Sequence, residues 1–254
     1  MKKILVKLLC AFIPVTNIRK LVRFCLYDAK AFNNNIILVE DGKEYVNSFF
    51  KILKLVRIRN FQIRILGKNN TIKIFLPVFV DKSSVALNGK DSYFELGCYC
   101  GLRHSSIFMY VGFCADVKQV LKIGEYSHLL KARFRFLDAG ECIIGKRNMI
   151  ARRVDFMVSD CHSIFDCDTK KVLNKQKNPL SIGDHVWIGE DVIILKNAQI
   201  PNNTIIARGS VVAGKFKEEN TVIAGNPARV VKTGVNWNVS SPEEYERGKV
   251  DSIL

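Results

Sequence analysis

Residues 182–212 decide the fold, and they read IGDHVWIGEDVIILKNAQIPNNTIIARGSVV. An aliphatic residue recurs in this stretch at every sixth position, at Ile182, Ile188, Ile194, Ile200, Ile206 and Val212. Neither an α-helix nor an ordinary strand has a period of six residues. Such a period describes a chain that runs straight briefly, turns a corner and repeats. Three such sides close a triangular coil, and stacked coils make a parallel β-helix with an aliphatic column inside.

The same phase extends upstream, with interruptions. It selects Ile144, Ile150 and Phe156, and before these Ile123 and Leu129. The pattern predicts coils from residue 123 to residue 225, while residues 61–122 are rich in β-formers but irregular. Residues 163–180 hold six charged residues and no period of six, which predicts a loop ejected from the coil.

The N-terminal part has a different pattern. Residues 1–30 carry seven positive residues and one Asp, beside an apolar helical face. This is typical of a basic amphipathic segment, which either packs on the main domain or lies on an anionic membrane surface. Its uninterrupted apolar run, residues 8–15, is too short to span a membrane.

Three segments follow from these patterns. Residues 36–46 predict a hairpin that turns at Asp41-Gly42, whereas residues 52–58 fit a helix or a strand equally well. We therefore divide the chain into an N-terminal appendage (1–57), a β-helix domain (58–231) with the ejected loop 163–180, and a C-terminal tail (232–254).

Composition and charge restrict the function further. The 254 residues include 39 Lys and Arg against 24 Asp and Glu, a net charge of +15, so the expected partners are anionic. The positive residues are dispersed without aromatic stacking platforms, which argues against nucleic-acid binding. The eight cysteines form no CxxC or CxxH pair, so we expect no metal site and reduced thiols in the cytoplasm.

Several motifs closely resemble those of the hexapeptide-repeat acyltransferases. They are residues 181–189 (SIGDHVWIG), 192–196 (VIILK), 209–212 (GSVV) and 224–229 (AGNPAR). The resemblance implies a left-handed parallel β-helix, a homotrimer with its site between neighbouring subunits, and acetyl-CoA as the acetyl donor. Residues 159–162 (SDCH), followed by a loop, are similar to the polysaccharide O-acetyltransferases of capsule and O-antigen synthesis, including those acting on sialic-acid capsules.

Three residues are candidates for catalysis. His162 sits where the column ends and the loop begins, and a histidine can take and return the proton of a sugar hydroxyl. The resemblance assigns this base role to His162 and places Trp187 beside the acetyl group and the acceptor. Asp160 lies on the same side as His162 if the segment stays extended, so it either orients the imidazole or stabilises a turn. We expect structural roles for His104 and His128 and a corner role for His185.

The resemblance also indicates where acetyl-CoA binds. The pantetheine arm is expected to meet the turn formed by Ala207, Gly209 and Ser210, although Arg208 stands where the family usually has a small residue. Lys215, Arg229 and Lys232 are candidates for the phosphates of the coenzyme. No metal is expected.

The leading hypothesis is an O-acetyltransferase that acts on a surface polysaccharide or its precursor, and the net positive charge favours an acidic acceptor. We expect a cytoplasmic protein whose residues 1–30 either pack on the main domain or contact the inner membrane peripherally. Two alternatives stay open: N-acetylation of an amino sugar nucleotide, and a non-catalytic glycan-binding β-helix.

Overall fold

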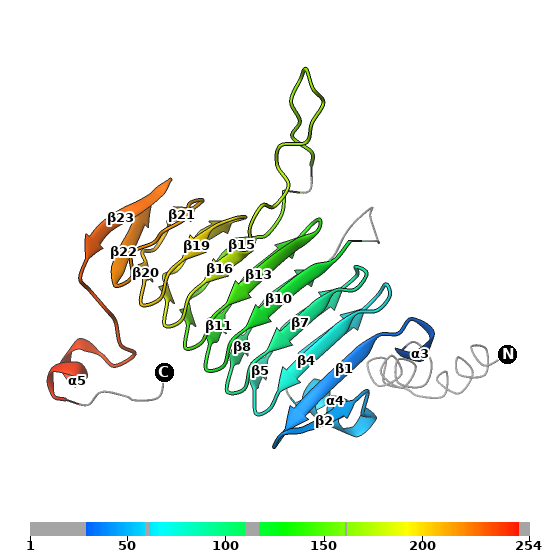
Figure 1. The fold of residues 1–254 in the computed structure, drawn as a ribbon. Coiled ribbons are helices and arrows are strands. Elements are labelled where there is room, and N and C mark those ends of the chain that lie inside the picture. Colours follow the sequence, from blue (N-terminus) through cyan, green and yellow to red (C-terminus); the bar gives the residue numbers. More distant parts are fainter. Residues whose placement is uncertain (1–28, 59–60, 110–116, 161, 249–254) are drawn as a thin grey trace.

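The computed structural model describes residues 29–58, 61–109, 117–160 and 162–248. Its strands form three sheets that wrap around one axis, so that each turn of the chain adds one strand to each sheet (Figure 1). Nearly all pairs are parallel, and the two antiparallel pairs lie at the ends of the stack. The predicted parallel β-helix is therefore confirmed.

The first sheet contains β1 (Asn35–Glu40), β2 (Lys43–Val46), β4 (Thr71–Phe75), β7 (Tyr93–Leu96), β10 (Gln119–Ile123), β13 (Gly140–Ile144), β16 (Leu180–Ile182) and β19 (Gln199–Ile200). The second contains β5 (Phe79–Asp81), β8 (Gly101–Arg103), β11 (His128–Leu130), β14 (Met149–Ile150), β17 (Trp187–Ile188), β20 (Ile205–Ile206), β22 (Thr221–Gly225) and β23 (Ala228–Thr233). The third contains β3 (Phe61–Ile65), β6 (Ser83–Leu87), β9 (Ser106–Met109), β12 (Arg133–Phe136), β15 (Asp155–Met157), β18 (Ile193–Leu195) and β21 (Val211–Val212).

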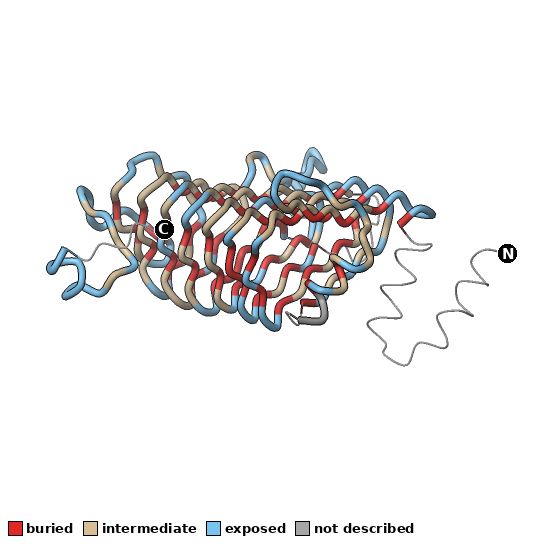
Figure 2. The backbone as a smooth tube through the Cα atoms, turned by 90° about the horizontal axis from the view of Figure 1, so that it is seen from below, coloured by how far each residue is buried: buried red, intermediate tan, exposed pale blue. Residues whose placement is uncertain are grey.

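The core is the column that the period of six predicts. All eleven aliphatic and aromatic residues that the phase selects are at most 3% exposed, from Ile123 to Val212. Figure 2 shows the buried positions recurring along the inside of successive coils. The column is hydrophobic throughout, and Phe134 stacks on Phe156 with ring centroids 4.3 Å apart. Burial of these side chains is the main stabilising contribution to the stack.

Corner residues satisfy the backbone where the strands stop. Asn202 Oδ1 accepts the amide N–H of Asp184 at 2.8 Å, which ties one corner to the next. His185 and Asn203 follow with φ of +55° and +53°, in the left-handed region that closes the turn. The corner position expected for His185 is confirmed.

The N-terminal elements begin with α3 (Ala29–Ala31) and the hairpin of β1 and β2, which turns at Asp41-Gly42 as predicted. The undecided residues 52–58 belong to a helix, α4 (Phe49–Ile58), whose Ile52 is buried against the core. β1 pairs in parallel with β4, so the first sheet starts upstream of residue 58. The basic segment 1–30 lies, except for its last two residues, outside the described part of the chain. Among the described residues, no helix is long and apolar enough to cross a membrane.

Candidate active site

Residues 158–179 leave the coil between β15 and β16, at the corner where the third sheet meets the first (Figure 1). The two limbs of this loop pair through an antiparallel bridge between Phe165 and Val172. At its tip, Asp166 Oδ1 accepts hydrogen bonds from the N–H and the hydroxyl of Thr169, at 2.8 and 2.9 Å. The loop is therefore a paired excursion with a capped tip.

The base of the loop is fixed to the coils on both sides. Gln176 exchanges two hydrogen bonds with the backbone of Glu141, at 2.7 and 2.9 Å. Asn197 Oδ1 accepts the N–H of Lys177 at 2.8 Å, and buried Ser159 Oγ accepts the N–H of Asp138 at 2.9 Å. These contacts hold the start and the end of the loop at one corner.

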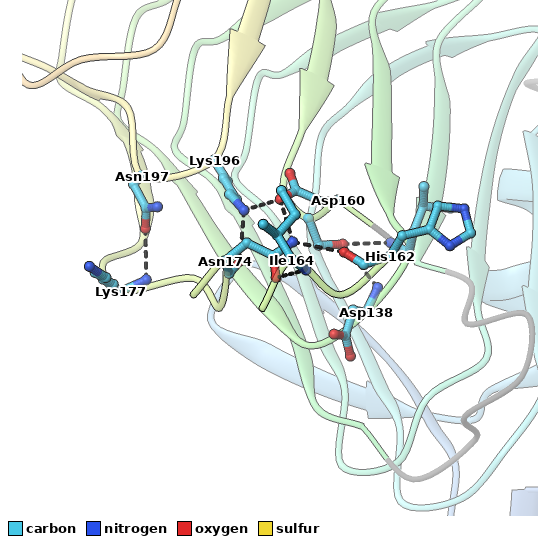
Figure 3. A network of polar contacts seen from close by, with 10 residues as sticks. Asp138, Asp160, His162, Ile164, Asn174, Lys177, Lys196 and Asn197 are labelled. Atoms are coloured by element: carbon cyan, nitrogen blue, oxygen red, sulfur yellow. Dashed lines mark hydrogen bonds and ion pairs between the residues drawn. The ribbon is translucent and has the colours of Figure 1, made fainter. Parts of the chain in front are cut away.

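His162 lies on the first limb, exposed to solvent. Its N–H donates to the carbonyl of Asp160 at 2.9 Å, and its carbonyl accepts Asn174 Nδ2–H at 2.8 Å. No hydrogen bond or ion pair to the described residues forms on its imidazole, which points away from the polar cluster beside it (Figure 3). The backbone of His162 is thus held while its ring remains available to a substrate.

Asp160 belongs to that polar cluster. Its carboxylate accepts hydrogen bonds from Lys196 Nζ and, at 2.8 Å, from Asn174 Nδ2. Burial raises the pKa of Asp160, but these hydrogen bonds and the charge of Lys196 outweigh it and keep the pKa below its ordinary value. The carboxylate is therefore ionised and anchors the turn that carries His162.

Asn174 and Lys196, which sequence reasoning did not select, complete the cluster. Besides Asp160 and His162, Asn174 binds the N–H of Ile164 through its Oδ1 at 2.9 Å. Lys196 donates to the carbonyl of Asn174 at 2.7 Å (Figure 3). One amide side chain therefore joins three positions of the first limb, and one lysine of the next coil holds that amide in place.

Trp187 lies on the outer face of β17, 42% exposed, while the next residue, Ile188, points into the core. Its register partners on the same face are Met149 and Ile205. A third neighbour, Trp237, comes from the C-terminal segment, with ring centroids 6.0 Å apart. Trp237 gave no periodic signal, and its only distinction in the sequence is that it is one of two tryptophans.

The expected pantetheine turn lies after β20. The hydroxyl of Ser210 is used inside the fold, because it donates to the carbonyl of Ala207 at 2.7 Å and accepts the N–H of Gly225 at 3.2 Å. Gly209 is exposed, and nothing lies within 4 Å of the place where a Cβ would stand. Arg208 is held along the corner by Asp191, 2.9 Å away. The turn therefore presents an open backbone edge.

The three expected phosphate-binding residues are exposed but not on one sheet. Arg229 and Lys232 belong to β23 of the second sheet. Lys215 instead forms an isolated parallel β-bridge with Gln199 of the first sheet. The structure thus places Arg229 and Lys232 on one strand and Lys215 beside another sheet.

The other histidines have structural surroundings. The His128 ring lies over Gly101, where a Cβ would come within 2.4 Å of His128 Nδ1. Burial and the nearby Arg103 lower the pKa of His128. His104 Nε2 lies 3.8 Å from an Asp81 carboxylate oxygen.

One chain does not bring His162 and Trp187 together. The loop with His162 leaves from the corner between the third and first sheets, whereas Trp187 faces outward from the second sheet. In a three-sided coil, that sheet lies opposite that corner.

Comparison with known proteins gives consistent results. The family model described as bacterial transferase hexapeptide (six repeats) matches residues 179–214. The chain is 31% identical over 183 residues to a polysialic acid O-acetyltransferase of Neisseria meningitidis, covering 69% of this chain and 79% of the relative. It is also 31% identical over 140 residues to the putative lipopolysaccharide biosynthesis O-acetyl transferase WbbJ of Escherichia coli K12, covering 52% and 65%.

Two solved acetyltransferase structures are similar to this chain. The polysialic acid O-acetyltransferase OatWY superposes with a TM-score of 0.62 at 25% identity, over 77% of this chain and 96% of that chain. The polySia-specific acetyltransferase NeuO gives a TM-score of 0.56 at 23% identity, over 75% and 94%. The second similarity concerns the fold alone.

Proposed function

Because the chain belongs to the hexapeptide-repeat acetyltransferases, we propose that it moves an acetyl group from acetyl-CoA to a hydroxyl of a bacterial surface polysaccharide, capsule or O-antigen, or of its precursor. Its coil is the left-handed parallel β-helix of that family. The observation that carries the proposal is the exposed imidazole of His162 on a backbone fixed by Asn174. The net charge of +15 suits an acidic acceptor.

The proposed chemistry needs one proton carrier. Acetyl-CoA supplies the activated thioester carbonyl. His162 takes the proton of the acceptor hydroxyl while the hydroxyl oxygen forms a bond to the thioester carbonyl carbon. When the C–S bond breaks, His162 returns the proton to the sulfur of CoA. Backbone N–H groups would stabilise the oxyanion. Trp187 would form an apolar wall beside the reacting groups, and Asp160 supports His162 by holding its turn.

The turn of Ala207, Gly209 and Ser210 fits an extended pantetheine arm, since Gly209 leaves its edge open. Ser210 would contribute through its backbone, because its hydroxyl is already bonded inside the fold. Arg229 and Lys232 would meet phosphates near this edge, and Lys215 would reach them only from the neighbouring sheet. Arg208 does not block the arm in this arrangement, since Asp191 holds it at the corner.

We further propose a homotrimer whose sites lie between subunits. The support is topological: His162 and Trp187 occupy opposite sides of one coil, so a second copy must supply one of them. A closed ring of three copies completes three equivalent sites.

The function is tested with purified protein, acetyl-CoA and polysialic acid, by following CoA release with a thiol reagent. We expect release that depends on the polymer and a product whose acetyl groups are removed by mild alkali. Alkali-stable acetylation of an amino sugar nucleotide would instead identify an N-acetyltransferase. Binding of surface glycans without any acetyl transfer would leave only the glycan-binding alternative.

The loop contacts predict a positioning role for Asn174. In Asn174→Ala, the turn at residues 160–164 loses three hydrogen bonds, and we expect kcat to fall between about 10-fold and 100-fold. The KM for acetyl-CoA should stay unchanged, because the coenzyme turn is on other coils. The measurement is steady-state kinetics, with Thr169→Ala at the tip of the same loop as the matched control. A wild-type kcat for Asn174→Ala would contradict this role.

A further inference from the structure

The C-terminal segment after β23 returns along the outside of the coils (Figure 1). It is attached first where the N–H of Val235 donates to the carbonyl of Asn220 at 2.9 Å. It is attached again where Trp237 Nε1–H donates to the carbonyl of His185 at 2.9 Å. Further along, the segment contains α5 (Pro242–Glu246), whose first turn is closed by a capping box between Ser241 and Glu244.

Trp237 is placed by the corner before β17. Its ring stacks on the imidazole of His185, with centroids 4.5 Å apart and planes 10° apart. The imidazole is itself fixed, because its Nδ1 lies 3.1 Å from Asn203 Oδ1. A hydrogen bond and a stacking contact therefore fix the orientation of Trp237. Both are made to His185, which lies two residues before Trp187 in the sequence.

This orientation brings the two indoles together. Their centroids are 6.0 Å apart and their planes are inclined by 43°, within the range in which aromatic rings attract each other. Met149 and Ile205 flank Trp187 along the sheet, and Trp237 flanks it from the segment outside the coil. Without Trp237, solvent would replace a rigid neighbour on that side, and the half-exposed indole would have more freedom to rotate.

Neither β23 nor the segment after it contributes much to the hydrophobic core. Stabilisation of the core therefore does not explain why this segment packs beside β17. None of the side chains of α5 is buried, and β23 exposes all its residues except Ala228. Trp237 is the residue of this segment that contacts rings next to the proposed site.

We propose that Trp237 is a positioning residue for Trp187, so that residues 234–241 form one side of the acetyl-transfer site. The inference rests on the proposed function, which makes Trp187 the wall beside the reacting groups. Trp237 acts through Trp187 by restricting its ring to the orientation that packs against the acceptor. An aromatic contact of this kind contributes about 0.5–1.5 kcal/mol, which corresponds to about a 2-fold to 10-fold effect.

The experiment uses the fact that the protein has only two tryptophans. Trp237→Phe and Trp237→Ala therefore both leave Trp187 as the sole source of tryptophan emission. We expect acrylamide to quench Trp187 more strongly, about twofold, in Trp237→Ala than in Trp237→Phe, since only the phenyl ring keeps a shielding neighbour. Equal quenching in the two variants would overturn the inference, whatever the activity.

Kinetics with acetyl-CoA and polysialic acid provide the second measurement. For Trp237→Ala we expect kcat/KM for the polymer to fall about tenfold, with an unchanged KM for acetyl-CoA and an unchanged melting temperature. Trp237→Phe should recover most of the rate. The control is Tyr245→Ala, which removes an exposed ring of α5 that makes no ring contact with Trp187 or Trp237.

The two hypotheses fail in different ways. If the wild-type protein transfers acetyl and Trp237→Ala does so equally well, the inference is overturned and the proposed function stands. If the wild-type protein transfers none, the proposed function is overturned, and the quenching comparison still decides whether Trp237 shields Trp187.

Discussion

His162→Ala is expected to lose acetyl transfer by between about 100-fold and 10,000-fold, the usual contribution of a general base. The reason is that a neutral sugar hydroxyl attacks a thioester poorly unless its proton is removed. The imidazole of His162 is exposed, so its removal opens no cavity, and it breaks no hydrogen bond or ion pair with the described residues. We therefore expect the melting temperature and the affinity for acetyl-CoA to stay at wild-type values.

The matched control is His104→Asn. His104 is also an exposed histidine, it lies at a corner with φ of +52°, and asparagine tolerates that conformation. This variant should keep its rate. Imidazole added to the buffer should restore part of the activity of His162→Ala, which a purely structural role would not allow. A His162→Ala rate above about a tenth of wild type would mean that another group is the base.

The fold could be predicted because its coils are regular where the sequence is regular. The register partners Ile182 and Ile200 are eighteen positions apart, which is three sides of six residues. Upstream, Ile72 and Phe94 are twenty-two positions apart, because longer corners separate strands that are otherwise equivalent. Residues 61–109 and 117–122 therefore form the same coils without a constant period. The sequence indicated only that residues 61–122 are rich in β-formers.

The candidate site could be predicted only where it depends on local position. The place of His162 at the end of the column made it a candidate, and its role as the base came from the family resemblance and stays a prediction. The expectation for Asp160 assumed an extended segment, but the bond from His162 N–H to the Asp160 carbonyl closes a turn instead. Their side chains therefore diverge, and the Asp160 carboxylate meets Lys196. Lys196 contacts Asp160, and Trp237 contacts His185, which are both far away in the sequence. No sequence period relates these pairs, so only the structure identifies Lys196 and Trp237.

His162→Ala and Trp187→Ala are expected to restore activity to each other when mixed, if the site lies between subunits. His162→Ala keeps Trp187, and Trp187→Ala keeps His162. The loop with His162 leaves one corner of the triangular coil, and Trp187 faces outward from the opposite sheet. In a ring, the histidine of one copy then meets the tryptophan of the next copy, so one interface of every mixed trimer contains both intact residues.

Random assembly of the two variants in equal amounts places an intact pair at about a quarter of all interfaces, so about a quarter of wild-type activity should return. The measurement is acetyl transfer after co-expression, or after unfolding and refolding the two proteins together. A mixture of His162→Ala with His162→Asn is the control, because no interface in it holds a histidine base. If the first mixture stays as inactive as its components, both residues must act within one chain, and the loop would have to cross the coil to reach Trp187.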